Sequence, residues 1–236
     1  MMGRLQLEEF WATYKRWPVP PELWDGKWAG TPCVIVGGGA SVPKNMEHYL
    51  TEWHAHGGVS IGINAAFALS PTIGHIGSYP YLLQIEGIAN GDHRDRRIHP
   101  SLFTVMSYII HHDKNPRGCA VLNTTPKERM TPWSYSLRGG IYPHNNSGVN
   151  ALNLADILGA NPIYLVGFDM SPGCWHDGYT HEREPTSATQ YTSYAAEFGV
   201  ASHHVGAKVY NVNPKDTLPF FERIDIDELL TRRHLP

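Results

Sequence analysis

The stretch that decides the fold is Cys33-Val34-Ile35-Val36-Gly37-Gly38-Gly39-Ala40-Ser41, a short apolar run that passes directly into a glycine turn. Four consecutive apolar residues bounded by glycine are typical of a strand buried on both faces. A helix is expected at about 43–54, and a second buried strand at 59–63 ends at Asn64. Strand, glycine turn, helix and strand make a βαβ unit. The sequence therefore predicts an α/β fold with a Rossmann-like, mostly parallel sheet flanked by helices.

The alternation of helix and strand returns after a less regular middle section. Helices are expected at about 149–158, 189–204 and 226–230, strands at 119–122, 162–166 and 208–212, and either element at 102–110. Residues 31–236 are expected to form a single α/β domain. Residues 1–30 are expected to form a helix and an aromatic, proline-rich lead-in. Its tryptophans look exposed enough to cover a partner subunit, which makes a homo-oligomer one candidate assembly; they are Trp11, Trp17, Trp24 and Trp28.

Composition excludes several classes of protein. Of 236 residues, 42% are hydrophobic and only 17% are charged, which disfavours both intrinsic disorder and a coiled coil. The net charge of −3 and the scattered 19 Lys and Arg residues argue against binding to nucleic acid through phosphate neutralisation. No apolar run approaches a membrane span. The three cysteines lie far apart, which suits a reducing compartment, and we expect a cytoplasmic protein.

Three polar turns follow or precede predicted elements at the edge where parallel sheets gather their binding residues. The glycine turn 37–41 lets backbone N–H groups approach an anion, although a tight turn without ligand explains it equally well. Asn64 ends the second strand, where it either binds a ligand or caps the next segment. In Asn145-Asn146-Ser147-Gly148, either Asn146 or Ser147 is a competent N-cap for the following helix. Convergence of the three turns at one edge favours binding.

A loop rich in histidine and carboxylate follows strand 162–166. It reads His176-Asp177-Gly178-Tyr179-Thr180-His181-Glu182. General acid–base catalysis is the favoured role because imidazole titrates near neutral pH. The spacing matches no zinc signature, and solvated loop histidines are the structural alternative. We therefore assign no metal site.

These residues also carry a resemblance to a known family. The segments 34–41, 62–64 and 147–169 resemble those of a nucleotide-binding α/β superfamily. It contains the bacterial CMP-sialic-acid-dependent sialyltransferases, the 6-hydroxymethylpterin pyrophosphokinase-like proteins and many uncharacterised phage and bacterial proteins. The resemblance covers about 31–230 and is most specific at 147–169. The turn here reads Gly-Gly-Gly-Ala-Ser, whereas the family usually has Gly-x-Gly-Pro-Ser.

The resemblance implies a role for each candidate residue. The nucleotide-binding set consists of Gly37, Gly38, Gly39, Ser41, Asn64, Asn146, Ser147, Gly148 and Asp169. Tyr164 would help to hold the leaving phosphate. A histidine beyond Asp169 would act as the catalytic base, and His181 is preferred to His176.

What the resemblance implies is a transferase that uses a nucleotide-activated donor. The favoured reaction is sialyltransferase-like glycosyl transfer from a CMP-linked sugar to an unspecified acceptor, with no metal or other cofactor. One alternative is ATP-dependent pyrophosphoryl transfer, which would need Mg²⁺ held by carboxylates such as Asp169 and Asp177. The other is a non-catalytic nucleotide-binding or scaffold protein, since fold alone does not fix function.

Overall fold

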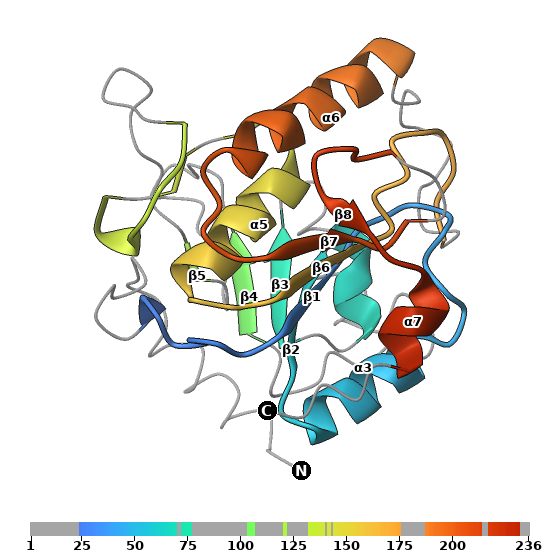
Figure 1. Cartoon of the computed structure of the whole chain (residues 1–236), viewed down its shortest axis with the longest axis horizontal. Helices are drawn as coiled ribbons and strands as arrows, with labels where there is room; N and C mark the ends of the chain where they lie inside the picture. Colours follow the sequence, from blue (N-terminus) through green and yellow to red (C-terminus); the bar gives the residue numbers. More distant parts are fainter. Residues whose placement is uncertain are drawn as a thin grey trace, which may run out of the picture.

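In the part of the chain that the structure describes, eight parallel strands form one sheet at the centre (Figure 1). The computed structural model describes residues 24–69, 72–76, 103–106, 120–121, 132–139, 141–142, 144–175, 187–213 and 217–231. Within these ranges the strands lie in the order β5-β4-β3-β2-β1-β6-β7-β8, and every neighbouring pair is parallel. The α/β fold with a parallel sheet, predicted from the sequence, is confirmed.

The elements are short and closely spaced along the chain. The strands are β1 Cys33–Val36, β2 Val59–Ile63, β3 Ile73–Ile76, β4 Phe103–Met106, β5 Ala120–Val121, β6 Ile163–Val166, β7 Val209–Asn211 and β8 Glu222–Arg223. The α-helices are α3 Met46–Ala55, α5 Ser147–Ile157, α6 Ala188–Ser202 and α7 Ile226–Thr231, and the 3-10 helices are η1 Asn64–Leu69 and η4 Leu137–Gly139. No helix in the described ranges is long and apolar enough to cross a membrane.

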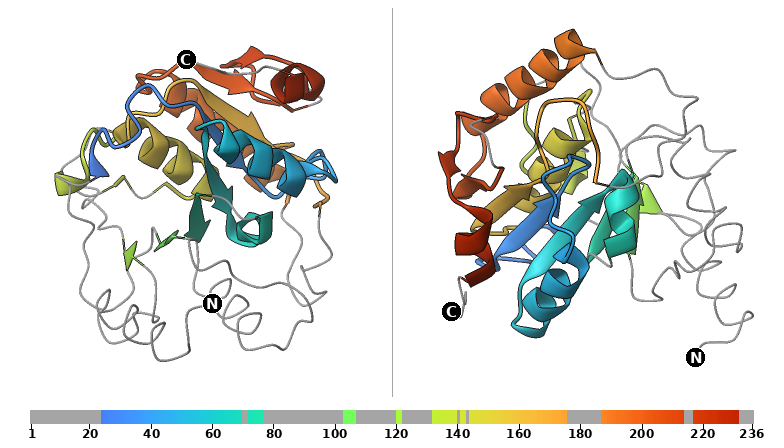
Figure 2. Two further views of the ribbon diagram at one scale, coloured as in Figure 1. Left: turned by 90° about the horizontal axis from the view of Figure 1, so that it is seen from below. Right: turned by 90° about the vertical axis from the view of Figure 1, so that its right-hand side faces the viewer.

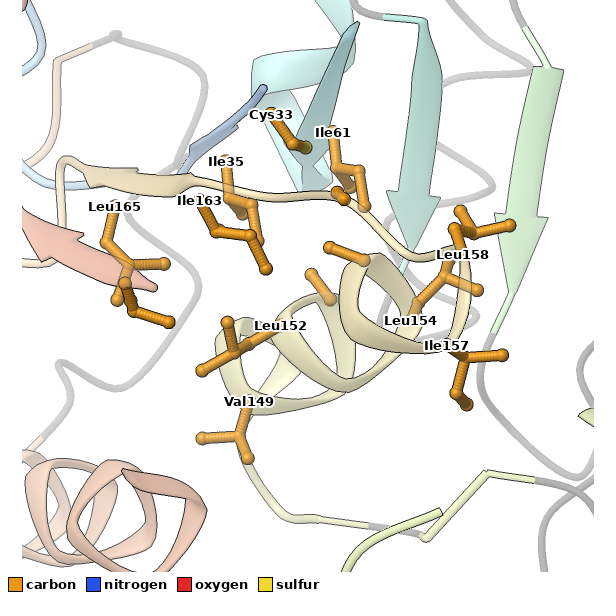
Figure 3. Close-up of a cluster of buried hydrophobic side chains, with 14 of the residues drawn as sticks. Cys33, Ile35, Ile61, Val149, Leu152, Leu154, Ile157, Leu158, Ile163 and Leu165 are labelled. Carbon is orange, nitrogen blue, oxygen red and sulfur yellow. The ribbon is translucent and has the colours of Figure 1, made fainter. Parts of the chain in front are cut away.

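Side chains of the central strands alternate between two buried clusters, one on each face of the sheet. On one face, Cys33 and Ile35 of β1 and Leu165 of β6 pack against α5, as Figure 3 shows. On the other, Val34 and Val36 pack with the apolar side chains of α3. In the right-hand view of Figure 2, α5 and α6 lie on one side of the sheet and α3 on the other. The period of two residues explains why these strands are apolar throughout.

Two tryptophans predicted to be exposed are part of the core instead. Trp24 and Trp28 are 9% and 8% exposed and belong to the cluster on the α5 face. Their segment is tied to the end of α5, since the amides of Gly26 and Trp28 donate to the carbonyls of Ile157 and Leu158. These two side chains therefore cover the chain's own core and not a partner subunit. Trp11, Trp17 and the predicted N-terminal helix lie outside the described residues.

Candidate functional site

The chain order reverses once across the sheet, between β1 and β6. From β1 the strands run outward to β5 in one direction, and from β6 to β8 in the other. The three central strands are in register at their ends, because Val36 lies opposite both Gly62 and Val166. The segments that follow β1, β2 and β6 therefore leave the sheet side by side. This reversal point at the carboxyl edge is where open α/β sheets bind their ligands.

The turns after β1 and β6 are joined by hydrogen bonds at this point. The amide of Gly37 donates to the Val166 carbonyl over 2.8 Å, and the amide of Gly39 donates to the Gly167 carbonyl, also over 2.8 Å. The Ser41 amide donates to Oδ2 of Asp169 over 2.9 Å, and the Ser41 hydroxyl donates to the other oxygen of the same carboxylate. Two predicted site segments that are 128 residues apart in sequence are thus in direct contact.

Glycine is required here because the two backbones approach so closely. A Cβ at Gly37 would lie 2.6 Å from the Gly167 oxygen, and one at Gly39 would lie 2.6 Å from Cγ of Asp169. Gly167 itself has φ +75, and its Cβ would lie 2.4 Å from a methyl group of Val42. The glycines therefore serve first to let the turns meet.

Alternate amides of the glycine turn remain available. Those of Gly37, Gly39 and Ser41 are engaged, whereas those of Gly38 and Ala40 donate to no described residue. Helix α3 begins only at Met46, three residues later than predicted, so its N-terminus is separated from the turn. Backbone N–H groups of the turn, more than the helix dipole, are what this segment can offer to an anion.

Asn64 lies at the same edge, directly after β2. It has φ 52, in the left-handed region that asparagine tolerates better than most residues, and it begins η1. Asn64 therefore makes the turn between β2 and η1, and the pairing of β2 with β1 places it at the edge of the sheet where the glycine turn also begins.

The N-terminus of α5 is largely satisfied from within the protein. The side chain of Asn146 accepts from the Gly148 amide over 2.7 Å and donates to the Tyr194 carbonyl, and its own amide donates to Glu197. Gly148 is buried against Phe168 and Phe198, where a Cβ would lie 2.5 Å from the Phe168 ring. The helix begins at Ser147, two residues before the predicted start, because Asn146 is its N-cap.

Tyr164 is not brought to this site. Its side chain is fully buried in the cluster on the α3 face, stacked on Tyr210 at 5.3 Å and edge-on to Trp53. It lies in the middle of β6, below the edge where the turns meet. The side chain that was expected to hold a leaving phosphate is thus a core residue in this structure.

The two candidate bases, His176 and His181, lie outside the described residues, as does Asp177. Strand β6 and the segment that follows it are described as far as Trp175. Within the described ranges, no three His, Cys, Asp or Glu side chains are grouped as a metal ion would need.

Two features at this edge were missed at the sequence level. Asn211 ends β7 and Asn213 follows it; Asn213 contacts the β6 turn through Phe168, and Asn211 contacts Asn213. The signal was a polar residue at a strand end, as for Asn64. His144 precedes α5, and its side chain is 5% exposed. Burial lowers its pKa to about 4 against a smaller opposing contribution from the Pro132 backbone, even though Glu197 lies 3.9 Å from Nδ1. No sequence pattern singled it out.

Comparison with solved structures supports the architecture. No family model matches the chain, and no curated protein matches it. Among solved structures, the chain is similar to the MAf glycosyltransferase from Magnetospirillum magneticum AMB-1, with a TM-score of 0.55 and 15% sequence identity. The match covers 87% of this chain but 35% of the other, so this chain spans about a third of that protein's length. At this identity the likeness shows a shared fold.

Proposed function

We propose that the chain is a transferase that binds a nucleotide-activated sugar at the carboxyl edge of β1 and β6. The observation that carries this proposal is the contact of the two turns at the reversal point, closed by Ser41 and Asp169. The similarity in fold to a glycosyltransferase supports glycosyl transfer as the reaction. CMP is the nucleotide favoured by the family resemblance.

Each side of the site has a distinct chemical task. The unengaged amides of Gly38 and Ala40 bind phosphate oxygens of the donor, since paired backbone N–H groups at a turn suit an anion. The Asp169 carboxylate repels phosphate and therefore faces a hydroxyl group of the ribose or sugar, from which it accepts a hydrogen bond. Asn64 contacts the nucleotide from the neighbouring strand end.

The reaction needs two further contributions. A base deprotonates the acceptor hydroxyl, and we assign it to His181, with His176 as the second candidate. Backbone amides stabilise the negative charge that develops on the departing nucleotide phosphate. No metal is required in this scheme, because neutral donors supply the stabilisation.

Thermal unfolding in the presence of nucleotides tests the proposal. CMP, UMP, ATP and GDP are each added with and without Mg²⁺, and we expect CMP without metal to raise the melting temperature. A shift that requires both ATP and Mg²⁺ would favour pyrophosphoryl transfer instead. No shift with any of the four nucleotides would contradict nucleotide binding altogether.

The assignment of the base has its own test. We expect His181→Ala to abolish turnover of the donor while CMP binding is retained, because a base acts on the acceptor and not on nucleotide affinity. His176→Ala is the matched control. Full activity in His181→Ala, with loss in His176→Ala, would move the base to His176.

A further inference from the structure

A pair of buried asparagines lies beside the β6 turn and has no part in the proposed chemistry. Asn211 and Asn213 are 0% and 1% exposed. Asn213 accepts a hydrogen bond from the Phe168 amide over 2.7 Å, through Oδ1. Buried amide side chains are retained only where their donors and acceptors are paired, so each atom of this pair has a definite partner.

The partners fix the orientation of both side chains. An amide N–H can only donate, so the Phe168 amide must face the oxygen of Asn213. The Asn213 Nδ2 then donates to Oδ1 of Asn211 over 2.6 Å, and that oxygen also accepts from the Asn213 amide over 3.1 Å. The Asn211 Nδ2 donates onward to the Leu218 carbonyl over 3.4 Å. A chain of hydrogen bonds thus runs from the turn after β6 to the segment before β8, and the donor and the acceptor of each bond are fixed.

Phe168 is held from the β7 side at both of its backbone polar groups. Its amide is bound by Asn213, and its carbonyl accepts from Oγ1 of Thr217 over 3.0 Å. The residues on either side of it face the opposite way, because Gly167 accepts from Gly39 and Asp169 accepts from Ser41. Three consecutive residues are thus bonded alternately to the two neighbouring segments.

We propose that Asn213 is a positioning residue, which holds the 167–169 turn where Asp169 meets Ser41 and so sets the geometry of the nucleotide site. The predicted effect on nucleotide binding rests on the proposed function, whereas the predicted effect on the position of the 167–169 turn does not. Among the described residues, Asn213 makes no hydrogen bond to Gly39 or Ser41. Its influence on them passes through Phe168, whose amide has no other described acceptor.

Amide hydrogen exchange tests the coupling without any ligand. We expect Asn213→Ala to raise the exchange rates of the Gly39 and Ser41 amides by about tenfold or more, since the buried amide of Phe168 loses its acceptor. The matched control is Asn153→Ala, because the Asn153 side chain is equally buried and also makes two hydrogen bonds, in its case both to the backbone of Ser134. Unchanged exchange at Gly39 and Ser41, or an equal rise in Asn153→Ala, would overturn the proposal.

A milder variant covers the case in which Asn213→Ala does not fold. Thr217→Val keeps the shape of the side chain and removes only the bond to the Phe168 carbonyl. A smaller rise in the exchange rates of the Gly39 and Ser41 amides supports the positioning role, and no rise contradicts it.

Nucleotide affinity then separates this proposal from the proposed function. If wild type binds CMP and Asn213→Ala binds it equally well, the positioning role of Asn213 is wrong. If wild type binds no nucleotide, the proposed function fails while the exchange result still decides the positioning.

Discussion

At the level of single residues, the contact between Ser41 and Asp169 joins the two turns of the candidate site. Both oxygens of the carboxylate are bound by one residue, through its amide and its hydroxyl, so the two turns are fixed relative to each other. Charge-assisted hydrogen bonds of this kind are stronger than neutral ones. A site that depends on the spacing of two turns should therefore be sensitive to the hydroxyl of Ser41.

We expect Ser41→Ala to lower the free energy of unfolding by about 1–2 kcal/mol and to weaken nucleotide binding. Urea denaturation and calorimetric titration with CMP measure the two effects. Ser136→Ala is a matched control, because the Ser136 hydroxyl also donates to a carboxylate, that of Asp25, in a different part of the chain. Equal losses of CMP affinity in both variants would argue against a special role for Ser41.

Gly39→Ala should have a larger effect than its size suggests. The new methyl group would lie 2.6 Å from Asp169 Cγ and 2.7 Å from the Gly167 oxygen, so one of the two turns must move. We expect loss of CMP binding in a protein that still folds. Gly206→Ala is the control, since its Cβ would meet only Asp156, at an ordinary 3.5 Å. Retention of wild-type affinity in Gly39→Ala would show that the turns do not need this contact.

At the scale of elements, the sequence predicted those strands whose apolar runs are uninterrupted. Strands β1, β2 and β6 are buried on both faces, and each was expected within about one residue of its observed bounds. The stretch 102–110 left a choice between helix and strand, and its residues 103–106 form β4. Strands β3 and β8 were not expected, because Ile73–Ile76 contains Gly and His and Glu222–Arg223 is charged and exposed. Their pairing with neighbours decides their structure.

The candidate site was predictable only in part, for a similar reason. The glycine turn, Asn64 and Asp169 stand at strand ends, where the topology rule applies. Tyr164 lies within a strand, and only the packing of Trp53 and Tyr210 shows that it faces the core. The role of Asn213 depends on contacts with Phe168 across 45 residues, which no local pattern contains.

Asn146 separates a structural from a binding role at the start of α5. We expect Asn146→Ala to cost about 1 kcal/mol of stability, because the Gly148 amide loses its cap. Asn146→Asp keeps that acceptor and should recover much of the stability. If CMP affinity and the free energy of unfolding fall together in Asn146→Ala and recover together in Asn146→Asp, the role of Asn146 is helix capping alone. A loss of affinity in Asn146→Asp without loss of stability would indicate direct contact with the nucleotide.

At the scale of the whole molecule, two histidines that are shielded from solvent, His54 in part and His144 almost fully, should make folding sensitive to mild acid. Burial lowers the pKa of His54 below its usual range and that of His144 to about 4. Between pH 6.5, the ordinary pKa of histidine, and about pH 4, the unfolded chain binds protons that the folded chain does not. We therefore expect the free energy of unfolding to fall as the pH drops through this window.

Urea denaturation at a series of pH values measures this dependence. His144→Gln should flatten the slope, because it removes the imidazole that burial keeps neutral in the folded chain. A slope that is the same in wild type and His144→Gln would mean that this imidazole is not kept neutral by burial.

The central claim is that a nucleotide binds where the β1 and β6 turns meet, and titration of the labelled protein with CMP, followed by amide resonances, tests it most directly. Without metal, we expect the resonances of Gly38, Ala40 and Asn64 to shift in proportion to occupancy, while those of His54 and Ser60 at the opposite edge of the sheet stay in place. Saturable shifts that include the first three residues are the predicted result. Binding that leaves Gly38 and Ala40 unmoved, or no binding at all, would contradict the account.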